Sequence, residues 1–429
     1  MNHRYQNSEN LLARALETIP LGSQTFSKSK TQYPFGVSPY FITKGLGSHV
    51  WDVDNNEYID FINGLAAITL GYNDPDVTAA VREQIEDGVI FSLPHPIEMQ
   101  VAEKLIEIVP CAEMVRFGKN GSDATTGAIR LARAYTKKDH VAVCGYHGWH
   151  DWYIGSTARN LGVPVEVQKL THTFIYNDIE SLHQIFQQYP DQIAAVILEP
   201  MNVFPPKDNF LEKVQDLTHQ HNAILIFDET VTGFRVAKGG AQEYFGVIPD
   251  LATFGKGLAN GYPISAVAGK ADIMKLMEEI FFSFTFGGET LSLAAALATM
   301  NKLQKLPVLE KIKEQGDKVV TGLKNLINYY DVDHIFSISG HPTWSFILIN
   351  NLEVYTQLQI KTLFLQEVFK RGILTLGSHN ISYAHNDVEV ERLLAVYGEV
   401  FPILKDAVDN CLLEKYLQCQ TLEPLFKVR

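Results

Sequence analysis

The sequence of 429 residues has few of the features that mark a secreted, membrane-bound or metal-binding protein. Its four cysteines, Cys111, Cys144, Cys411 and Cys419, are scattered, and no CxxC or Cys/His spacing typical of a metal site occurs. No apolar run approaches the roughly 18 residues of a membrane-spanning helix, and the first residues lack the apolar core of a signal peptide. We therefore expect a cytoplasmic protein with reduced thiols, no bound metal and no membrane partner.

Positive charge is also scarce. The sequence has 36 lysines and arginines against 49 aspartates and glutamates, which gives a net charge of −13. A broad basic surface, and hence a nucleic-acid partner, is therefore not expected. With 46% hydrophobic and 20% charged residues, the composition is that of an ordinary globular protein, and the length favours one large domain with a smaller one.

The apolar pattern predicts three parts. Residues 1–60 form an N-terminal segment with a helix and a hairpin, which we expect to pack with the smaller domain. In residues 61–305, predicted helices alternate with continuously apolar runs, which are typical of strands in a mostly parallel sheet covered on both faces. These runs are 114–117, 140–144, 193–198, 223–227 and 266–269. Residues 306–429 are expected to form a smaller α+β domain, so the predicted fold class is α/β with a second domain.

Two residues point to pyridoxal phosphate chemistry. Lys256 lies between two glycines after a short apolar run, and Asp228 directly follows the run 223–227. A lysine amine forms a Schiff base with the aldehyde of this cofactor, and an acid holds its pyridine nitrogen protonated. Each residue also has a simpler interpretation when taken alone, since Lys256 could be a surface side chain and Asp228 could form a salt bridge with Arg235.

Two further segments follow predicted strands, at the edge where open α/β sheets bind ligands. Gly121 and Ser122 precede a predicted helix whose free N–H groups could bind a phosphate, although Ser122 or Asp123 could simply cap that helix. Residues 144–151 contain Tyr146 and other ring side chains that suit stacking on a flat ligand, or only a packed aromatic loop. Together, the four segments favour a pyridoxal phosphate site over coincidence.

With these segments, the chain resembles the class III pyridoxal-phosphate aminotransferases of fold type I, in the branch of glutamate-1-semialdehyde aminomutase. The resemblance extends from residue 19 to about residue 404. Its most specific segments are 121–133, 146–148, 228–235, 239–243, 249–256 and 284–288. It implies a large cofactor-binding domain, pyridoxal 5′-phosphate as the cofactor, and a homodimer with its active sites at the interface.

The resemblance assigns roles to the residues around the cofactor. It implies that Lys256 forms the Schiff base and then moves the proton between the substrate and the cofactor. It implies that Asp228 pairs with the pyridine nitrogen, that Gly121 and Ser122 bind the phosphate, and that Tyr146 stacks on the ring.

Four more residues are placed near the cofactor in the same way. Thr285 resembles the residue that reaches the phosphate of the neighbouring subunit, and Glu199 resembles the family glutamate near cofactor and substrate. Thr230 replaces an apolar residue that usually packs on the ring. Val231 replaces a residue that is often polar, near the 3′-oxygen of the cofactor.

The substrate-binding residues depart from the family pattern. Lys28 stands where the aminomutase has an arginine for the substrate carboxylate, and residues 378–384, including His379 and Asn380, replace another arginine segment. We therefore expect an aminotransferase that acts on an amino donor and a small aldehyde, keto or sugar-type carbonyl acceptor, bound by Lys28, Glu199, His379 or Asn380. The alternatives are an aminomutase of the glutamate-1-semialdehyde type and a non-catalytic protein that binds pyridoxal phosphate.

Overall fold

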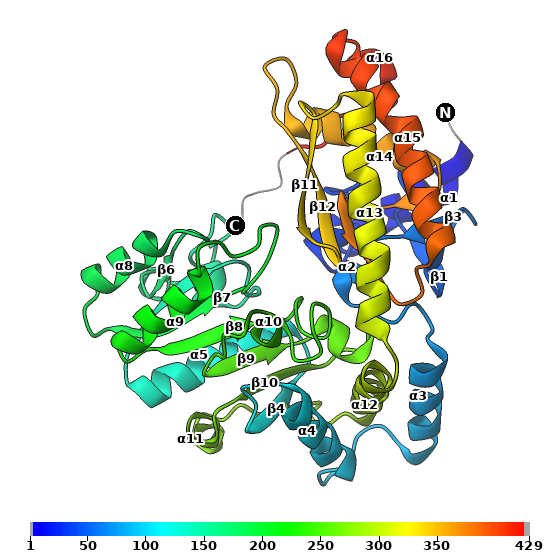
Figure 1. Ribbon diagram of the computed structural model, residues 1–429. Helices are drawn as coiled ribbons and strands as arrows, with labels where there is room; N and C mark the ends of the chain where they lie inside the picture. The colour runs from blue at the N-terminus through cyan, green and yellow to red at the C-terminus, as the bar shows by residue number, and fades with distance from the viewer. Residues whose placement is uncertain (1–2, 424–429) are drawn as a thin grey trace. The chain divides into compact units, whose positions relative to one another are not determined.

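The computed structural model describes residues 3–423, which divide into two compact units (Figure 1). One unit comprises residues 75–309, and the other combines residues 3–74 with residues 310–423. The divisions fall at 74/75 and 309/310, whereas the sequence analysis placed domain boundaries at 60/61 and 305/306.

A seven-stranded sheet forms the centre of the larger unit within the described residues. Its order is β4 (Met114–Gly118), β10 (Ser265–Gly269), β9 (Leu251–Phe254), β8 (Ile224–Asp228), β7 (Ile193–Leu198), β5 (His140–Cys144) and β6 (Thr171–Thr173). The strands from β9 to β6 run parallel to one another, and β10 is antiparallel to both of its neighbours. The prediction of a mostly parallel sheet is confirmed, and all five predicted apolar runs are strands.

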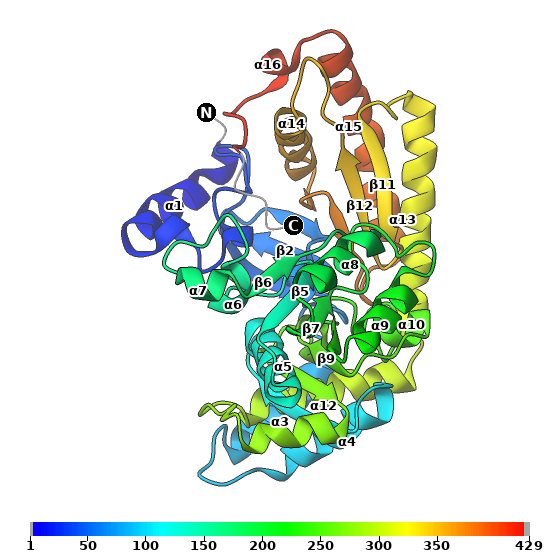
Figure 2. The same cartoon turned by 90° about the vertical axis from the view of Figure 1, so that its left-hand side faces the viewer.

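Helices cover both faces of this sheet, which explains why its strands are apolar throughout. Val141 and Val143 of β5 face the core under α5 (Gly121–Thr136), whereas Ala142 faces the core under α8 (Ile179–Gln188) and α9 (Phe210–Gln220). Figure 2 shows α5 and α9 on opposite sides of the sheet. Burial of both alternating sets of side chains is the expected result for a sheet of parallel strands.

The remaining long helices of the larger unit group around α12. Helix α12 (Thr290–Lys305) packs against α3 (Pro75–Asp87), α4 (Pro96–Ile108) and the 3-10 helix η4 (Lys256–Ala259). Short helices complete the unit: α6 (Asp151–Ile154), α7 (Val165–Gln168), α10 (Ala241–Phe245), α11 (Ala271–Met274) and η5 (Lys275–Glu278).

The smaller unit contains two sheets in its described residues. One has the order β1 (Ile42–Leu46), β2 (His49–Asp52), β3 (Glu57–Asp60) and β13 (Ile373–Leu374), and the other has the order β11 (Phe336–His341), β12 (Trp344–Ile349) and β14 (Ser378–Asn380). Because β13 pairs in parallel with β3, the N-terminal segment and the C-terminal region share a sheet.

The helices of the smaller unit come from both ends of the chain. The longer ones are α1 (Gln6–Thr18), α13 (Val308–Tyr330), α14 (Gln357–Lys370) and α15 (Asp387–Asp409). The short ones are η1 (His3–Tyr5), η2 (Pro20–Gly22), η3 (Phe26–Lys28), α2 (Asn63–Ala66) and α16 (Leu413–Tyr416).

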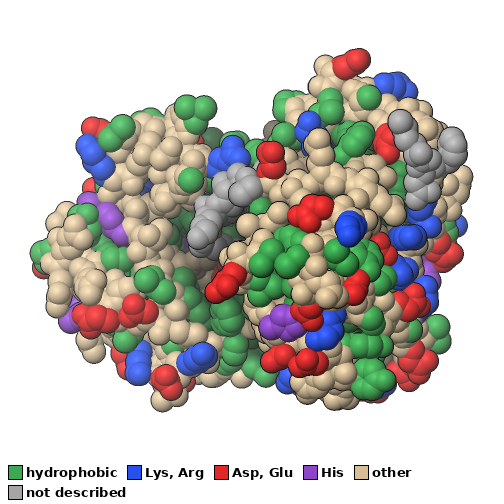
Figure 3. Space-filling view, turned by 90° about the horizontal axis from the view of Figure 1, so that it is seen from above, with side chains coloured by type: hydrophobic (Ala, Val, Ile, Leu, Met, Phe, Trp, Pro, Cys, Tyr) green, Lys and Arg blue, Asp and Glu red, His purple; other side chains and the backbone are tan. Residues whose placement is uncertain are grey.

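The surface carries charges of both signs. On the face drawn in Figure 3, lysines and arginines lie among aspartates and glutamates. Between residues 3 and 423, no helix is both long and apolar enough to cross a membrane.

Candidate active site

The predicted site residues of the larger unit follow strands that end at one edge of its sheet. Asp228 is the last residue of β8, Lys256 follows β9, Tyr146 follows β5 and Gly121 follows β4. The carboxyl ends of neighbouring parallel strands meet at the same edge, and ligands of open α/β sheets bind there.

Asp228 is buried and held by three hydrogen bonds. Its Oδ2 lies 2.8 Å from His147 Nδ1, and its Oδ1 accepts from Thr230 N at 3.1 Å and from Thr253 Oγ1 at 3.2 Å. Burial alone would raise the pKa of Asp228, but the hydrogen bond and charge of His147, with the contacts of Thr230, outweigh it and lower the pKa. The ion pair of Asp228 in this structure is therefore with His147, and the carboxylate is kept charged.

His147 is a site residue that the sequence analysis did not single out. Its Nδ1 faces the Asp228 carboxylate, and its Nε2 lies 3.2 Å from the carbonyl oxygen of Cys144. The two contacts hold the His147 ring between the end of β8 and the end of β5. A histidine 81 residues from its aspartate gives no sequence signal for this pairing, because only the fold brings the two loops together.

Glu229, next to Asp228, has a structural role. Its carboxylate accepts hydrogen bonds from the backbone nitrogens of Ala241 and Gln242 at 2.8 and 2.9 Å, at the start of α10. Thr232 also donates to it. Burial raises the pKa of Glu229 above its ordinary value. The adjacent acids are thus divided between two tasks, with Asp228 in the site and Glu229 holding α10.

The predicted phosphate loop begins helix α5, and Asn120 is its cap. Asn120 Oδ1 accepts from Asp123 N at 3.2 Å, and Asp123 Oδ2 accepts from the backbone nitrogens of Asn120 and Lys119 at 3.0 and 2.9 Å. Of the two residues suggested as caps, Ser122 is not one, because Asn120 occupies that position, whereas Asp123 completes the capping box with Asn120. Ser122 Oγ instead accepts from Trp149 N at 3.2 Å, and the free N–H groups of the first turn remain suited to a phosphate.

The loop after β5 lies close against the start of α5. Gly148 has a φ of 105°, and a Cβ on it would lie 2.2 Å from Ser122 Oγ, so glycine is required there. Tyr146 donates its backbone N–H to Glu199 Oε2 at 2.9 Å, and its side chain is 39% exposed. An accessible ring next in the chain to His147, which contacts Asp228, fits the predicted stacking role.

Thr230 lies between the predicted phosphate loop and Gly255, which precedes the predicted cofactor lysine Lys256. A Cβ on Gly121 would be 3.3 Å from Thr230 Cγ2, and a Cβ on Gly255 would be 3.4 Å from the same methyl group. The methyl group of Thr230 is thus available as the apolar surface that the family usually provides at this position. Val231 follows in the same turn and is partly buried.

Lys256 begins the 3-10 helix η4 and is partly buried. Its φ of 39° lies in the left-handed region that residues other than glycine rarely adopt. Backbone strain of this kind gathers at functional sites. The buried charged acid, the lysine and the helix start therefore fit pyridoxal phosphate, with Asp228 for its ring nitrogen, Lys256 for its aldehyde and Gly121–Ser122 for its phosphate.

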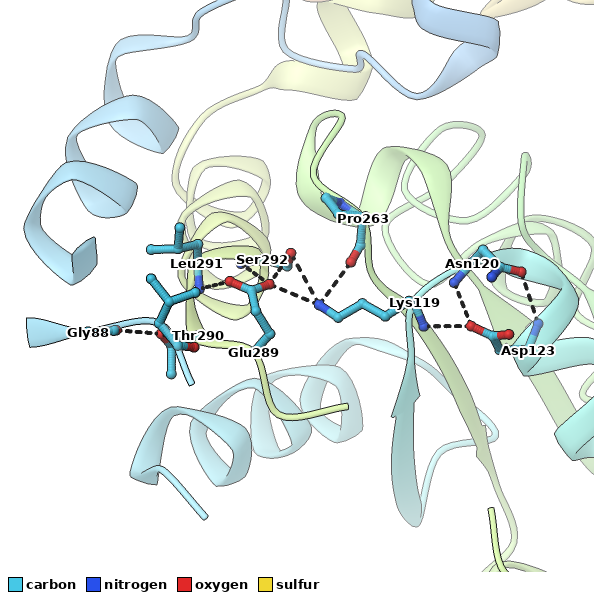
Figure 4. A network of polar contacts seen from close by, with 10 residues as sticks. Gly88, Lys119, Asn120, Asp123, Pro263, Glu289, Thr290, Leu291 and Ser292 are labelled. Carbon is cyan, nitrogen blue, oxygen red and sulfur yellow. Dashed lines mark hydrogen bonds and ion pairs between the residues drawn. The ribbon is translucent and has the colours of Figure 1, made fainter. Parts of the chain in front are cut away.

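A lysine next to the phosphate loop connects three segments of the site (Figure 4). Lys119 Nζ lies 2.9 Å from Glu289 Oε2, 3.1 Å from the carbonyl oxygen of Pro263 and 3.4 Å from Ser292 Oγ. Pro263 follows the segment that bears Lys256, and Glu289 accepts from the first backbone nitrogens of α12. Burial would raise the pKa of Glu289, but hydrogen bonds from Ser292 and Lys119 lower it, so the pair is ionic. This pair was not expected from the sequence.

The remaining predicted residue of the cofactor site, Thr285, is exposed in the loop before α12. Glu199, after β7, is buried, and its Oε2 also accepts from Asn202 Nδ2 at 2.7 Å. Its contact with Tyr146 places it next to the ring-stacking loop.

The other predicted substrate residues belong to the smaller unit. Lys28 ends η3 and is exposed. His379 is fully buried, with its ring nitrogens 2.8 Å from Tyr397 Oη and 3.1 Å from Ser345 Oγ, and burial lowers its pKa to about 3. Asn380 donates to the carbonyl oxygen of Ile62 at 2.7 Å. These contacts are all with residues of the smaller unit, to which the strand β14 that carries His379 and Asn380 also belongs.

Within the described chain, no group of three or more histidine, cysteine or acidic side chains is placed to hold a metal ion.

Asp228 ends β8 and Lys256 follows the adjacent β9, an arrangement that fits the pyridoxal-phosphate enzymes of fold type I. The family model described as Aminotransferase class-III matches residues 32–390, and the chain belongs to this family. Its fold is that of fold type I, and its cofactor is pyridoxal 5′-phosphate.

Several known proteins are similar over nearly the whole chain. The 3-aminobutyryl-CoA aminotransferase of Cloacimonas acidaminovorans is 35% identical over 393 residues, which cover 89% of this chain and 94% of that protein. The glutamate-1-semialdehyde 2,1-aminomutase of Aquifex aeolicus is 34% identical over 389 residues, covering 86% and 91%. The structure of the FumI protein of Sphingopyxis sp. MTA144, in its PLP internal aldimine form, has a TM-score of 0.86 and 27% identity, with coverage of 97% and 98%.

Proposed function

We propose that this protein is an aminotransferase that moves an amino group between an amino donor and a small carbonyl acceptor, through Lys256. The observation that carries the proposal is the buried carboxylate of Asp228, hydrogen-bonded to His147, at the end of the strand next to the one that Lys256 follows. When bound, pyridoxal phosphate would supply an aldehyde group that reacts with amines and a ring that withdraws electrons from the substrate carbon.

The residues of this chain divide the remaining work. Asp228, kept charged by His147, holds a proton on the pyridine nitrogen, and the first turn of α5 binds the phosphate. Lys256 takes a proton from the substrate carbon and returns one, as a general base and acid. Thr230 and Tyr146 confine the ring from its two faces.

We propose that the amino group moves between two molecules, as in an aminotransferase, rather than within one molecule, as in an aminomutase. Relatives of both kinds are similar to nearly the same extent, at 35% and 34% identity, so the comparison alone does not choose. Lys28 at the position of the aminomutase arginine favours transfer, because lysine lacks the planar fork that binds a carboxylate with two hydrogen bonds. The name of the first relative, a 3-aminobutyryl-CoA aminotransferase, also fits a substrate whose reacting carbon carries no carboxylate.

The experiment is a single half-reaction. The cofactor-loaded enzyme is mixed with an amino donor and no acceptor, and the carbonyl product is quantified. Release of one carbonyl product per active site supports a transferase. Sustained conversion of glutamate-1-semialdehyde to 5-aminolevulinate at a normal enzymatic rate would support the aminomutase alternative. Cofactor binding without either reaction would support the non-catalytic alternative.

We further propose that the active form is a homodimer in which Thr285 reaches the phosphate site of the neighbouring subunit. The exposure of Thr285 in the loop before α12 supports this assignment, because its hydroxyl group is accessible to a second subunit. No nucleic-acid or membrane partner is part of the proposal.

A further inference from the structure

We infer that the substrate carries an uncharged apolar group and that this group binds in a cavity of about 550 Å³ at the ends of β5, β6 and β7. The inference rests on the proposed function, because it names the substrate class of the same site. It narrows the expected acceptors, because a largely apolar wall favours an apolar group over a sugar.

The cavity adjoins the cofactor site. Gly145 and Glu199 form part of its wall, and Glu199 accepts the hydrogen bond from the backbone of Tyr146, the predicted stacking residue. The next residue, His147, contacts Asp228 at the end of β8, and β8 is the neighbour of β7. A substrate that reacts beside the ring can therefore extend over the ends of β7 and β5.

The side chains that face the cavity are largely apolar. Phe174, Ile175, Val203 and Phe204 line it, together with the ring of Tyr176. Ile175 and Phe204 are 65% and 52% exposed, so two large apolar side chains stand in contact with water at this cavity. Exposed apolar side chains gathered at a concave site mark a place where an apolar ligand binds.

Four hydroxyl groups of the wall, those of Tyr153, Tyr176, Ser156 and Thr157, donate to backbone carbonyl oxygens of the protein. Tyr153 Oη donates to the carbonyl oxygen of Gly145 at 2.7 Å, and Tyr176 Oη donates to that of Pro200 at 2.7 Å. Ser156 Oγ donates to the carbonyl oxygen of Tyr153 at 2.7 Å, and Thr157 Oγ1 donates to that of Ile154 at 2.8 Å. A sugar that enters the cavity would lose its hydrogen bonds to water. Because these four hydroxyl groups already donate to the protein, the sugar would regain few of the lost hydrogen bonds, and its binding would cost free energy.

The carboxylate of Glu199 disfavours ligands that would place a carboxylate group in the cavity. Glu199 places its carboxylate in the wall and is held there by Asn202 Nδ2 and the Tyr146 N–H. A second carboxylate in the same cavity would be repelled. The cavity volume lies in the range of about 300–1,000 Å³ that is usual for small-molecule sites, so an alkyl chain or an aromatic ring fits.

The first test compares two amines of equal size in the half-reaction. Pentylamine and 4-aminobutan-1-ol differ only in a terminal methyl group or hydroxyl group. The wild-type enzyme is expected to prefer pentylamine by about tenfold or more in kcat/KM. This is the discrimination that one apolar group in a hydrophobic pocket typically provides. Val203→Phe fills the cavity and should remove most of this preference, and Val203→Thr, which keeps the shape but adds a hydroxyl group, should reduce it.

The matched control is Val165→Phe. Val165 is 59% exposed in α7 and lies outside the cavity lining, so the same change of side chain should leave the preference unchanged. Equal rates with both amines, or a preference that survives Val203→Phe, would overturn the inference.

The second test does not depend on cofactor chemistry. Binding of the uncharged fluorophore N-phenyl-1-naphthylamine is measured by its fluorescence, and Val203→Phe is expected to weaken it about tenfold, whereas Val165→Phe does not. Equal binding to both variants would overturn the assignment of the cavity. If neither amine reacts while dye binding still depends on Val203, the proposed function fails and the apolar binding site stands.

Discussion

At the scale of single residues, the site depends on how a buried acid keeps its charge. Burial favours the neutral form of Asp228, and His147 reverses this preference from a distance of 2.8 Å. Because the pKa of Asp228 is lowered, its charged form stabilises the folded protein above the unfolded pKa, and this contribution is lost as the pH falls through the folded pKa.

Replacing His147 by Gln should therefore raise the pKa of Asp228 and move the acidic limb of the kcat/KM profile to higher pH. We expect cofactor affinity to fall about tenfold, since an ionic hydrogen bond to a buried carboxylate is lost. The measurements are the pH–rate profile and the cofactor dissociation constant. His150→Gln, in the same loop, is the control, because His150 contacts Thr126 rather than Asp228. An unchanged acidic limb in His147→Gln would show that His147 does not control Asp228.

At the scale of secondary-structure elements, the start of α5 connects stability with cofactor binding. Asn120 caps this helix, and Lys119, immediately before it, ties the phosphate loop to the start of α12 and to the segment after Lys256. The Asn120 cap should affect the free energy of unfolding, whereas the Lys119 ion pair, which positions a binding loop, should affect cofactor affinity.

Replacing Asn120 by Ala should lower the free energy of unfolding by about 1 kcal/mol, which is the usual effect of losing a helix cap. Asn120→Asp should keep most of the stability, because aspartate is an equally good cap. Denaturant unfolding of the two variants and the wild type measures both effects. Equal stability of all three proteins would contradict the capping role.

Replacing Lys119 by Met should weaken cofactor binding several-fold, because the phosphate loop loses its tie to Glu289 and Pro263. The double variant Lys119→Glu with Glu289→Lys should recover part of the affinity. Cofactor release during dialysis, followed by absorbance, is the readout. Lys104→Met removes a lysine that pairs with Glu107 away from the site and should leave cofactor affinity unchanged. Equal losses for Lys119→Met and Lys104→Met would contradict a positioning role.

Some elements could be predicted from the sequence, and others depend on partners in the fold. The runs 140–144, 193–198 and 223–227 were recognised because strands buried on both faces are continuously apolar. Strand β6 has the sequence Thr-His-Thr, and β13 has two residues, so neither carries a pattern and only pairing makes them strands. Lys256 and Asp228 follow apolar runs and could be singled out. Lys119 and Glu289 are 170 residues apart, and only folding pairs them.

At the scale of the whole molecule, the proposed dimer places part of each active site on the neighbouring subunit. A hybrid dimer tests this arrangement. One subunit carries Lys256→Ala and the other carries Thr285→Ala. If Thr285 serves the neighbouring subunit, the subunit with an intact Lys256 receives an intact Thr285, and one site of wild-type affinity is restored. If Thr285 serves its own subunit, or the protein is a monomer, mixing the variants restores no wild-type site.

The central claim is that Lys256 is the residue that carries the cofactor. Reduction of the cofactor-loaded protein with borohydride, followed by proteolysis and mass spectrometry of the peptides, tests it most directly. We predict a single modified peptide with the cofactor attached to Lys256, and none in Lys256→Ala. Attachment at another lysine, such as Lys119 or Lys28, or an unchanged yield of modified peptide in Lys256→Ala, would contradict the account.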